Sequence, residues 1–491
     1  MASLRSINEQ QENPEQGNDA SAQGQLQTRD LLYGDADLSK QANLAKPAET
    51  PVASCPDSKA YLELLNGAIN TFYEPERLNG EQVATLKTKY NCSIKSDADA
   101  VKYADEALKA FGDPYTDVIP ANEAKEIERA ERGETTGIGV EISAKPKQEV
   151  KGEGQTQSGQ SEGSNIIIKR VIDGTPAQLA GMKAGEQIVK VNDELIDTET
   201  AEETAKLIRG DVDTKVRVTV GKDGENREIE LTRQVIDTPA VKSEMRDGFL
   251  HLQVTTFSQI DASEEVQQAI EKNPEAKGYI LDLRNNPGGY VREALQTGSL
   301  IMSEGNMLST RERADVDGKT SFDISTYRLD AESIKMTTIQ EGKPGVEKYN
   351  ETVFDRHKDI VDKPVVILVN EHSASASELL TGALKDNNEA YVIGTQTYGK
   401  GIGQNQIRSN LPEGSWLKVT TFKYFTPNGT WVGDAASNKI GLTPNLVVPL
   451  AENAELNSAA DNQLQAALAH LKQATAPIQG TPEVLAKKEK Y

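Results

Sequence analysis

The sequence predicts an α+β protein of several domains: a small helical domain, a small partly open β-barrel and a larger α/β domain. Three observations predict this organisation. The chain has 491 residues, which suggests two to four domains at about 100–200 residues each. Apolar residues recur at helical spacing early in the chain, and short strands separated by turn signals fill the next stretch. Strands and helices then alternate, which is typical of a sheet covered by helices.

The N-terminal part divides into two regions by composition. Residues 1–52 are rich in Gln, Asn, Asp, Ser and Ala, so we expect this segment to be disordered. Residues 53–135 are expected to form a helical domain. Its first helix lies in DSKAYLELLNGAINTFYE, where Asp57 or Ser58 is positioned as the N-cap. A second helix follows in SDADAVKYADEALKAFGD and ends at Gly112.

Two cysteines, Cys55 and Cys92, flank the first helical segment. They either form one disulfide in an oxidising compartment or are two unrelated buried residues. The histidines are scattered and show no spacing typical of metal ligands, so no metal site is expected; they are His251, His357, His372 and His470.

The remaining chain is expected to hold two further domains and a tail. Residues 136–235 contain short strands and two helices, with a flexible insertion at 144–164. Residues 239–451 alternate strands and helices. Within them, the polar segment 303–362 is unusually long for a connection and is predicted to be an irregular insertion or flap. A C-terminal helix and a polar tail occupy 452–491.

The charge of the chain excludes several classes of partner. The formal net charge is −22, which argues against binding to nucleic acid and to anionic membrane surfaces. No run of 18 apolar residues is present, so no transmembrane helix is expected. No secretory signal is visible, so either the protein is made without one or this sequence begins after it.

The candidate nucleophile and its candidate bases lie in the stretch VNEHSASASELLTGALKDNNEAYVIGTQTYGKGIGQ. An apolar strand ends just before the serines and a helix follows, where backbone N–H groups and the helix dipole favour developing negative charge. A serine there needs a base. His372 is close in sequence, whereas Lys400 lies between glycines and would be a base once neutral. The alternative is an ordinary tight helix start with a solvated lysine.

The two motifs in this stretch, VNEHSASASELL and TYGKGIGQ, resemble the catalytic core of the C-terminal processing peptidases, a tail-specific serine protease family. The resemblance extends to LDLRNNPGG, GTPAQLAGMKAGEQIVKVND and GLTPNLVV and covers roughly residues 105–450. It implies that Ser375, the middle serine, is the nucleophile. It also implies that Lys400 is the general base and that Gln404 orients the lysine.

The turn in LDLRNNPGGY can be interpreted from its own residues. Two glycines after a buried strand let backbone N–H groups approach a substrate closely. The alternative is an ordinary strand-to-helix turn. The resemblance implies that this turn lies beside the nucleophile, so Gly288 or Gly289, with the N–H of Ala376, would form the oxyanion hole. Arg284 is interpreted as a buried structural arginine rather than a catalytic one.

Residues 136–235 resemble a PDZ domain. The resemblance implies that the GIGV loop captures a C-terminal carboxylate and that the following strand pairs with the peptide. The residues concerned are Gly137, Ile138, Gly139 and Val140. Arg209 is a weaker candidate, which would link the ligand state to the protease. The alternative is that this strand only closes the barrel.

Taken together, the resemblance implies a serine endopeptidase with a crotonase-like α/β protease domain, which needs no metal and no nucleotide. Its partners would be protein substrates with exposed C-terminal tails, and a homodimer or an adaptor protein is left open. An extracytoplasmic location is expected. One alternative is a silent PDZ scaffold that binds C-termini without turnover. A third hypothesis is an esterase-like hydrolase that uses His372.

Overall fold

The computed structural model describes most of the chain beyond its N-terminal segment. The described residues are 58–144, 166–196, 200–222, 224–316, 319–343, 347–357, 363–408, 410–452 and 454–476. Residues 1–52, most of the insertion at 144–164 and Cys55 lie outside them. Cys92 is disulfide-bonded. The helix after Cys55 is capped by Ser58, whose side chain accepts a hydrogen bond from the Tyr61 N–H.

The chain divides into two compact units. The first contains the described residues up to Ala121 together with Ser303–Arg356 and Gly401–Ala435. The second contains Asn122–Met302, His357–Lys400 and the described residues from Ala436 onward. The chain therefore passes between the units several times, whereas the sequence analysis divides it into consecutive domains.

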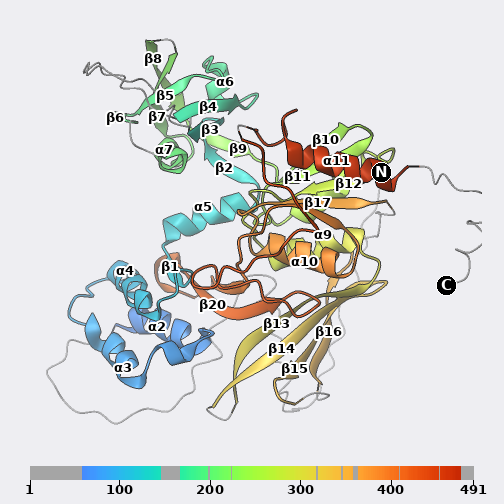
Figure 1. The fold of residues 1–491 in the computed structure, drawn as a ribbon. Helices are drawn as coiled ribbons and strands as arrows, with labels where there is room; N and C mark the ends of the chain where they lie inside the picture. Colours follow the sequence, from blue (N-terminus) through green and yellow to red (C-terminus); the bar gives the residue numbers. More distant parts are fainter. Residues whose placement is uncertain are drawn as a thin grey trace, which may run out of the picture. The chain divides into compact units, whose positions relative to one another are not determined.

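The first unit packs helices on an antiparallel sheet (Figure 1). Its helices are α2 (Lys59–Thr71), α3 (Gly80–Lys89) and α4 (Asp97–Leu108). Its sheet has the strand order β1-β20-β13-β14-β15-β16, and β19 also pairs with β20. The bounds are β1 (Asp117–Ile119), β13 (Gly305–Val316), β14 (Lys319–Leu329), β15 (Ser333–Gln340), β16 (Glu347–Asp355), β19 (Ile402–Ile407) and β20 (Trp416–Phe425). Buried residues of α2 and α4 form one core with Leu417 and Val419 of β20.

The described part of segment 303–362 is not irregular, so that part of the prediction is wrong, whereas its being an insertion stays a prediction. Strands β13 to β16 fill most of it and pair antiparallel in sequence order. The strands were missed because some of their buried positions are polar, such as Thr310, Ser325 and Thr338, which weakens the alternation of apolar and polar residues.

The second unit is built on a six-stranded sheet with the order β10-β11-β12-β17-β18-β21. Strand β10 pairs antiparallel with β11, and the other neighbours are parallel. The bounds are β10 (Val241–Arg246), β11 (Phe249–Val254), β12 (Tyr279–Asp282), β17 (Val365–Val369), β18 (Tyr391–Gly394) and β21 (Leu446–Val447). All residues of β12 and β17 are buried, as expected for parallel strands covered on both faces.

Helices cover both faces of this sheet. Helix α11 (Asn462–Ala474) packs its leucines against β11, β12, β17 and β18 in one hydrophobic cluster. Helices α9 (Val291–Ile301) and α10 (Ala376–Asp386) lie on the opposite side of the sheet from α11 (Figure 1). Helix α8 (Ala262–Glu271) contacts α9 and β11. The sheet is therefore shielded from water, and its strand ends become the accessible parts.

A smaller sheet in the second unit has the strand order β3-β4-β5-β7-β8, with β6 paired to β5. Its strands are β3 (Val140–Ala144), β4 (Ile166–Val171), β5 (Gln187–Val191), β6 (Glu194–Leu195), β7 (Lys215–Lys222) and β8 (Glu225–Thr232). Helices α6 (Pro176–Leu179) and α7 (Ala201–Ile208) accompany it. Strand β2 (Glu134–Gly137) precedes this sheet in the chain and β9 (Gln234–Asp237) follows it, and the two pair with each other. Helix α5 (Ala121–Glu131) precedes β2. Closure into a barrel stays a prediction.

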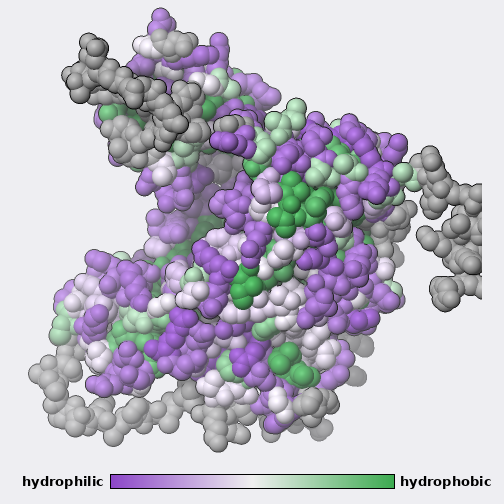
Figure 2. Space-filling view, in the orientation of Figure 1, coloured by the Kyte–Doolittle hydropathy of each residue, from purple (hydrophilic) through white to green (hydrophobic). Residues whose placement is uncertain are grey.

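Hydrophilic side chains cover most of the surface seen in Figure 2, in keeping with the acidic composition. Among the helices of the described ranges, none is both long and apolar enough to cross a bilayer.

Replacing Leu464 by Ala is expected to destabilise the second unit by about 2–5 kcal/mol, because its fully buried side chain joins α11 to the central sheet. Gln465→Ala, on the exposed face of the same helix, is the control and should change stability by less than about 0.5 kcal/mol. Chemical denaturation measures both changes. Equal midpoints for the two variants would contradict the packing described.

Candidate active site

Three neighbouring parallel strands end at the same edge of the central sheet. Strand β12 runs into the Gly-Gly turn, β17 into the serine turn and β18 into the lysine loop. The carboxyl ends of parallel strands are the usual position of binding and catalytic residues in open α/β sheets. This arrangement brings together segments that are up to about a hundred residues apart in the sequence.

The structure separates the three serines of the SASAS run. Ser373 is fully buried, and its Oγ donates to the Leu283 carbonyl over 2.8 Å and accepts from the Asn370 N–H over 2.9 Å. Ser377 is also fully buried and donates to the Asn286 carbonyl over 3.0 Å. Ser375, by contrast, is partly exposed. The two flanking serines therefore hold the turn in place, and the middle serine is the one that a substrate can reach.

Ser375 occupies a strained backbone conformation directly before α10, with φ 55° and ψ −117°. A positive φ is uncommon for a residue with a Cβ, and such strain is concentrated at functional sites. Sharp turns of this kind between a strand and a helix lift a nucleophilic side chain out of the backbone of the sheet.

The Glu378 carboxylate connects this turn to the lysine loop. Its Oε2 accepts from the backbone N–H of Ser375 over 2.9 Å and from that of Lys400 over 2.8 Å. Its Oε1 accepts from the Gly399 N–H over 2.7 Å and from the Thr397 hydroxyl over 2.6 Å. The backbone nitrogens of Ser375 and Lys400 thus donate to the same oxygen atom. The side chains of these two residues therefore branch from backbone positions that lie close together.

Glu378 is completely buried. Burial raises the pKa of its carboxyl, and the hydrogen bonds from Thr397, Lys400, Gly399 and Ser375 oppose that rise. These four donors occupy the acceptor positions of a carboxylate. Sequence reasoning missed this residue, although Ser375 and Glu378 fit the S-x-x-E pattern of a capping box at the start of a helix.

The lysine loop packs tightly. The Tyr398 N–H donates to the Ser373 carbonyl over 3.0 Å, which attaches the loop to the serine turn. Gly399 has φ +91°, and a Cβ there would lie 2.9 Å from the backbone of Lys439 and Ile440. A glycine is therefore required immediately before Lys400.

The Gly-Gly turn lies against the serine turn. Gly288 has φ +96°, and a Cβ there would lie 2.7 Å from the Ala374 carbonyl oxygen and 2.8 Å from the Ala376 nitrogen. The Gly288 N–H donates to the Asn286 side chain over 2.9 Å. Gly289 has φ +144° and no room for a Cβ beside the Phe257 backbone. Only glycines allow these close approaches.

A buried ionic network lies at the start of this turn. Arg284 donates to Asp282 from Nε over 2.8 Å and from Nη2 over 2.6 Å, and its Nη1 lies 2.8 Å from Asp461. Burial alone would raise the pKa of Asp282, but hydrogen bonds from Arg284 and His251 hold it below its usual range. Asp461 also caps α11, so the network fixes that helix to the end of β12. These contacts agree with a structural role for Arg284.

Two further residues predicted for the site are Gln404 and His372. Gln404 belongs to the first unit, on β19, where its side-chain amide donates to the Thr420 hydroxyl over 3.1 Å. Its role toward Lys400 stays a prediction. His372 has a side chain that is 66% exposed and that lies 3.8 Å from the Glu371 carboxylate.

The GIGV loop lies between β2 and β3. Gly139 has φ +86°, and a Cβ there would lie 2.3 Å from the Thr175 side chain. The Ile138 carbonyl accepts from the Ala177 N–H, and Ile138 is buried in the core of the small sheet. Strand β3 pairs with β4 and forms an edge of that sheet among the described strands. Arg209 is exposed at the end of α7.

Comparison with known proteins places the chain among proteases. A model of peptidase family S41 matches residues 248–448, and a PDZ domain model matches residues 167–221. A carboxy-terminal-processing protease of Bartonella bacilliformis is 31% identical over 396 residues, which cover 79% of this chain and 78% of that protein. The chain belongs to peptidase family S41. Its function is that of a serine protease carrying a PDZ domain.

Further proteases are similar to this chain. A carboxyl-terminal-processing protease of Synechocystis is 30% identical over 416 residues, covering 82% of this chain and 83% of that one. A probable CtpA-like serine protease of Staphylococcus aureus is 30% identical over 404 residues, which cover 81% of this chain and 70% of that protein. The solved structure of a photosystem II D1 C-terminal processing protease aligns with 22% sequence identity and a TM-score of 0.46. The alignment covers 79% of this chain and 92% of that one. The relatives found by sequence do not support the silent-scaffold alternative.

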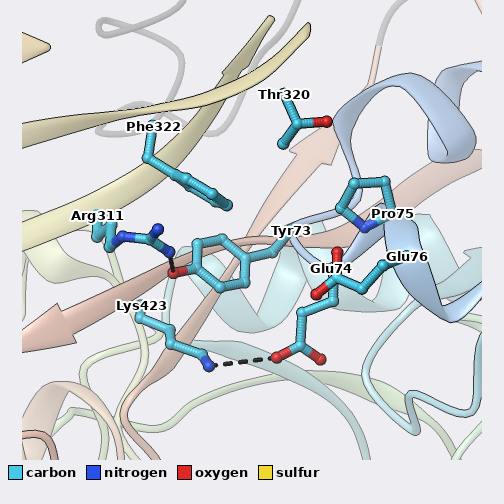
Figure 3. A pocket seen from close by; sticks show the side chains of 8 residues that line it. All are labelled: Tyr73, Glu74, Pro75, Glu76, Arg311, Thr320, Phe322 and Lys423. Atoms are coloured by element: carbon cyan, nitrogen blue, oxygen red, sulfur yellow. Dashed lines mark hydrogen bonds and ion pairs between the residues drawn. The ribbon is translucent and has the colours of Figure 1, made fainter. Parts of the chain in front are cut away.

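A pocket of about 560 Å³ lies wholly within the first unit (Figure 3). The Arg311 guanidinium lies over the Phe322 ring, donates to the Tyr73 hydroxyl and pairs with Glu341. Lys423 pairs with Glu74 over 3.2 Å. The cations of this pocket are therefore matched by groups of the protein itself.

Glu378→Gln is expected to lower kcat for peptide cleavage by about 10²-fold or more, because small misplacements of catalytic groups have effects of this size. An amide offers one acceptor oxygen to groups that now share two, and its NH₂ would face other donors. Glu371→Gln, on the exposed part of the same turn, is the matched control. Steady-state kinetics on folded variants measure both, and wild-type kcat for Glu378→Gln would contradict this role.

Proposed function

We propose that the protein hydrolyses peptide bonds with a Ser375–Lys400 dyad and recognises substrate C-termini through its PDZ domain. The observation that supports the dyad best is the shared Glu378 oxygen, which accepts from the backbone N–H groups of both residues. The partial exposure of Ser375 between two buried serines supports its choice as the nucleophile.

The reaction follows from these two groups. The Ser375 Oγ attacks the carbonyl carbon of the peptide as its proton passes to the neutral Lys400 amine. The C–N bond then breaks, and the Lys400 ammonium gives that proton to the leaving amine. Water attacks the resulting ester, passing a proton to Lys400, and the acid product leaves as Ser375 regains its proton. Gln404 is proposed to orient the lysine.

The tetrahedral intermediate needs donors for its oxyanion. We assign the N–H groups of Gly289 and Ala376 to this role, because the Gly288 N–H is already donated to Asn286. The proximity of Gly288 to the Ala376 nitrogen supports this assignment. A crotonase-like topology of the protease domain, spanning 239–451, is part of the same proposal.

The PDZ region, 136–235, is proposed to bind the C-terminal tail of the substrate. The N–H groups of the loop from Gly137 to Val140 would hold the carboxylate, and the open edge of β3 would pair with the peptide backbone. Arg209 is proposed to couple this binding to the protease. The location is proposed to be extracytoplasmic, and either a homodimer or an adaptor would be compatible with it.

Ser375→Ala and Lys400→Ala are expected to abolish cleavage of casein while leaving the fold intact. Lys400→Arg should also be inactive, because a guanidinium does not lose its proton to become a base. His372→Ala is the control and should retain activity, since its side chain is exposed and lies beside Glu371. Loss of activity in His372→Ala together with an active Lys400→Ala would favour the histidine-based hydrolase instead.

A peptide with a free C-terminal carboxylate is expected to be cleaved with a higher kcat than its C-terminal amide. This result follows if occupancy of the PDZ groove favours the arrangement in which Lys400 is aligned. Steady-state kinetics on the acid and amide forms measure the difference. If the amide raises KM and leaves kcat unchanged, the PDZ domain only tethers the substrate.

A further inference from the structure

Asn286 stands between the Gly-Gly turn and the serine turn and makes contacts to both. It is completely buried. Its side-chain oxygen accepts from the Gly288 N–H over 2.9 Å, and its Nδ2 donates to the Val254 carbonyl over 3.0 Å. Its own carbonyl accepts from the Ala374 N–H over 3.0 Å and from the Ser377 hydroxyl over 3.0 Å.

We infer that Asn286 is a positioning residue for the oxyanion site. This inference rests on the proposed Ser375–Lys400 mechanism. Through its main chain Asn286 holds the residues on both sides of Ser375, and through its side chain it holds Gly288. One residue thus sets the spacing between the turn that carries the nucleophile and the turn that carries the second oxyanion donor.

The side chain of Asn286 also decides which N–H of the glycine pair is available. Because its oxygen accepts from the Gly288 N–H, that donor is turned toward the protein and away from substrate. The donation from Nδ2 to the Val254 carbonyl, at the end of β11, fixes the amide in this orientation. Without these two bonds the Gly288 N–H would compete with that of Gly289 for the same oxyanion.

The consequence for catalysis is specific. The hydrogen bond from an oxyanion donor is stronger in the transition state than in the ground state. Misplacing the donor therefore lowers kcat and leaves KM nearly unchanged. Affinity for an analogue that forms a tetrahedral adduct with Ser375 should fall in parallel. The pH at which the dyad titrates should not move, because Asn286 carries no charge and contacts neither Lys400 nor Glu378 in the hydrogen bonds described.

The test compares Asn286→Ala with Leu464→Ala, a variant destabilised in the core between α11 and the central sheet. Asn286→Ala is expected to lower kcat by about 10–100-fold, with KM and the pH profile unchanged. Its affinity for a peptide boronate should fall by the same factor as kcat. Leu464→Ala should keep wild-type kcat and boronate affinity at temperatures where it is folded. Unchanged kcat, or a change confined to KM, would overturn the inference.

Asn286→Asp keeps the test decisive if the alanine variant does not fold. Its carboxyl retains an acceptor for the Gly288 N–H but, when ionised, cannot donate to Val254. Compared with the wild type at the same pH, its kcat and boronate affinity should therefore be reduced while the carboxyl is ionised and should approach wild-type values as the carboxyl protonates. Equal values to wild type at all pH would refute the inference. An active Ser375→Ala enzyme would instead refute the dyad itself.

Discussion

The candidate active site depends on one buried carboxylate. Glu378 lies in the first turn of α10 and accepts hydrogen bonds from the serine turn on one side and from the lysine loop on the other. A buried carboxylate is unfavourable unless its acceptors are satisfied. Four donors satisfy this one, so the burial of Glu378 and the approach of the two loops depend on each other. The positions of Ser375 and Lys400 follow from that coupling.

The rest of the second unit supports this arrangement in layers. The parallel strands β12, β17 and β18 bring three loops to one edge of the sheet. The Arg284 network fixes the end of β12 to α11, and Asn286 fixes the following turn to the serine turn. Each contact joins segments that are distant in sequence. The backbone strain at Ser375 is held by this surrounding structure.

The sequence predicts the α+β organisation and draws attention to the segments around Ser375 and Lys400 because their signals are local, whereas the roles of these residues are implied by the family resemblance. The buried run of β17 and the glycines beside Lys400 can be recognised from a few neighbouring residues. Strands β13 to β16 were not recognised, because polar residues such as Thr310, Ser325 and Thr338 occupy some of their buried positions and interrupt the apolar pattern. The importance of Glu378 and Asn286 was also missed. Their roles come from contacts with the 397–400 loop and with Ala374, which no local pattern specifies.

The most direct measurement is the rate and site of fluorophosphonate labelling, followed by peptide mapping, in the wild type and in Glu378→Gln. We expect the wild-type label on Ser375 and not on Ser373 or Ser377, which are buried. Labelling of the folded Glu378→Gln variant should be much slower, because the serine turn and the lysine loop have lost their common acceptor. A label on another residue, or equal rates in the two proteins, would contradict this expectation.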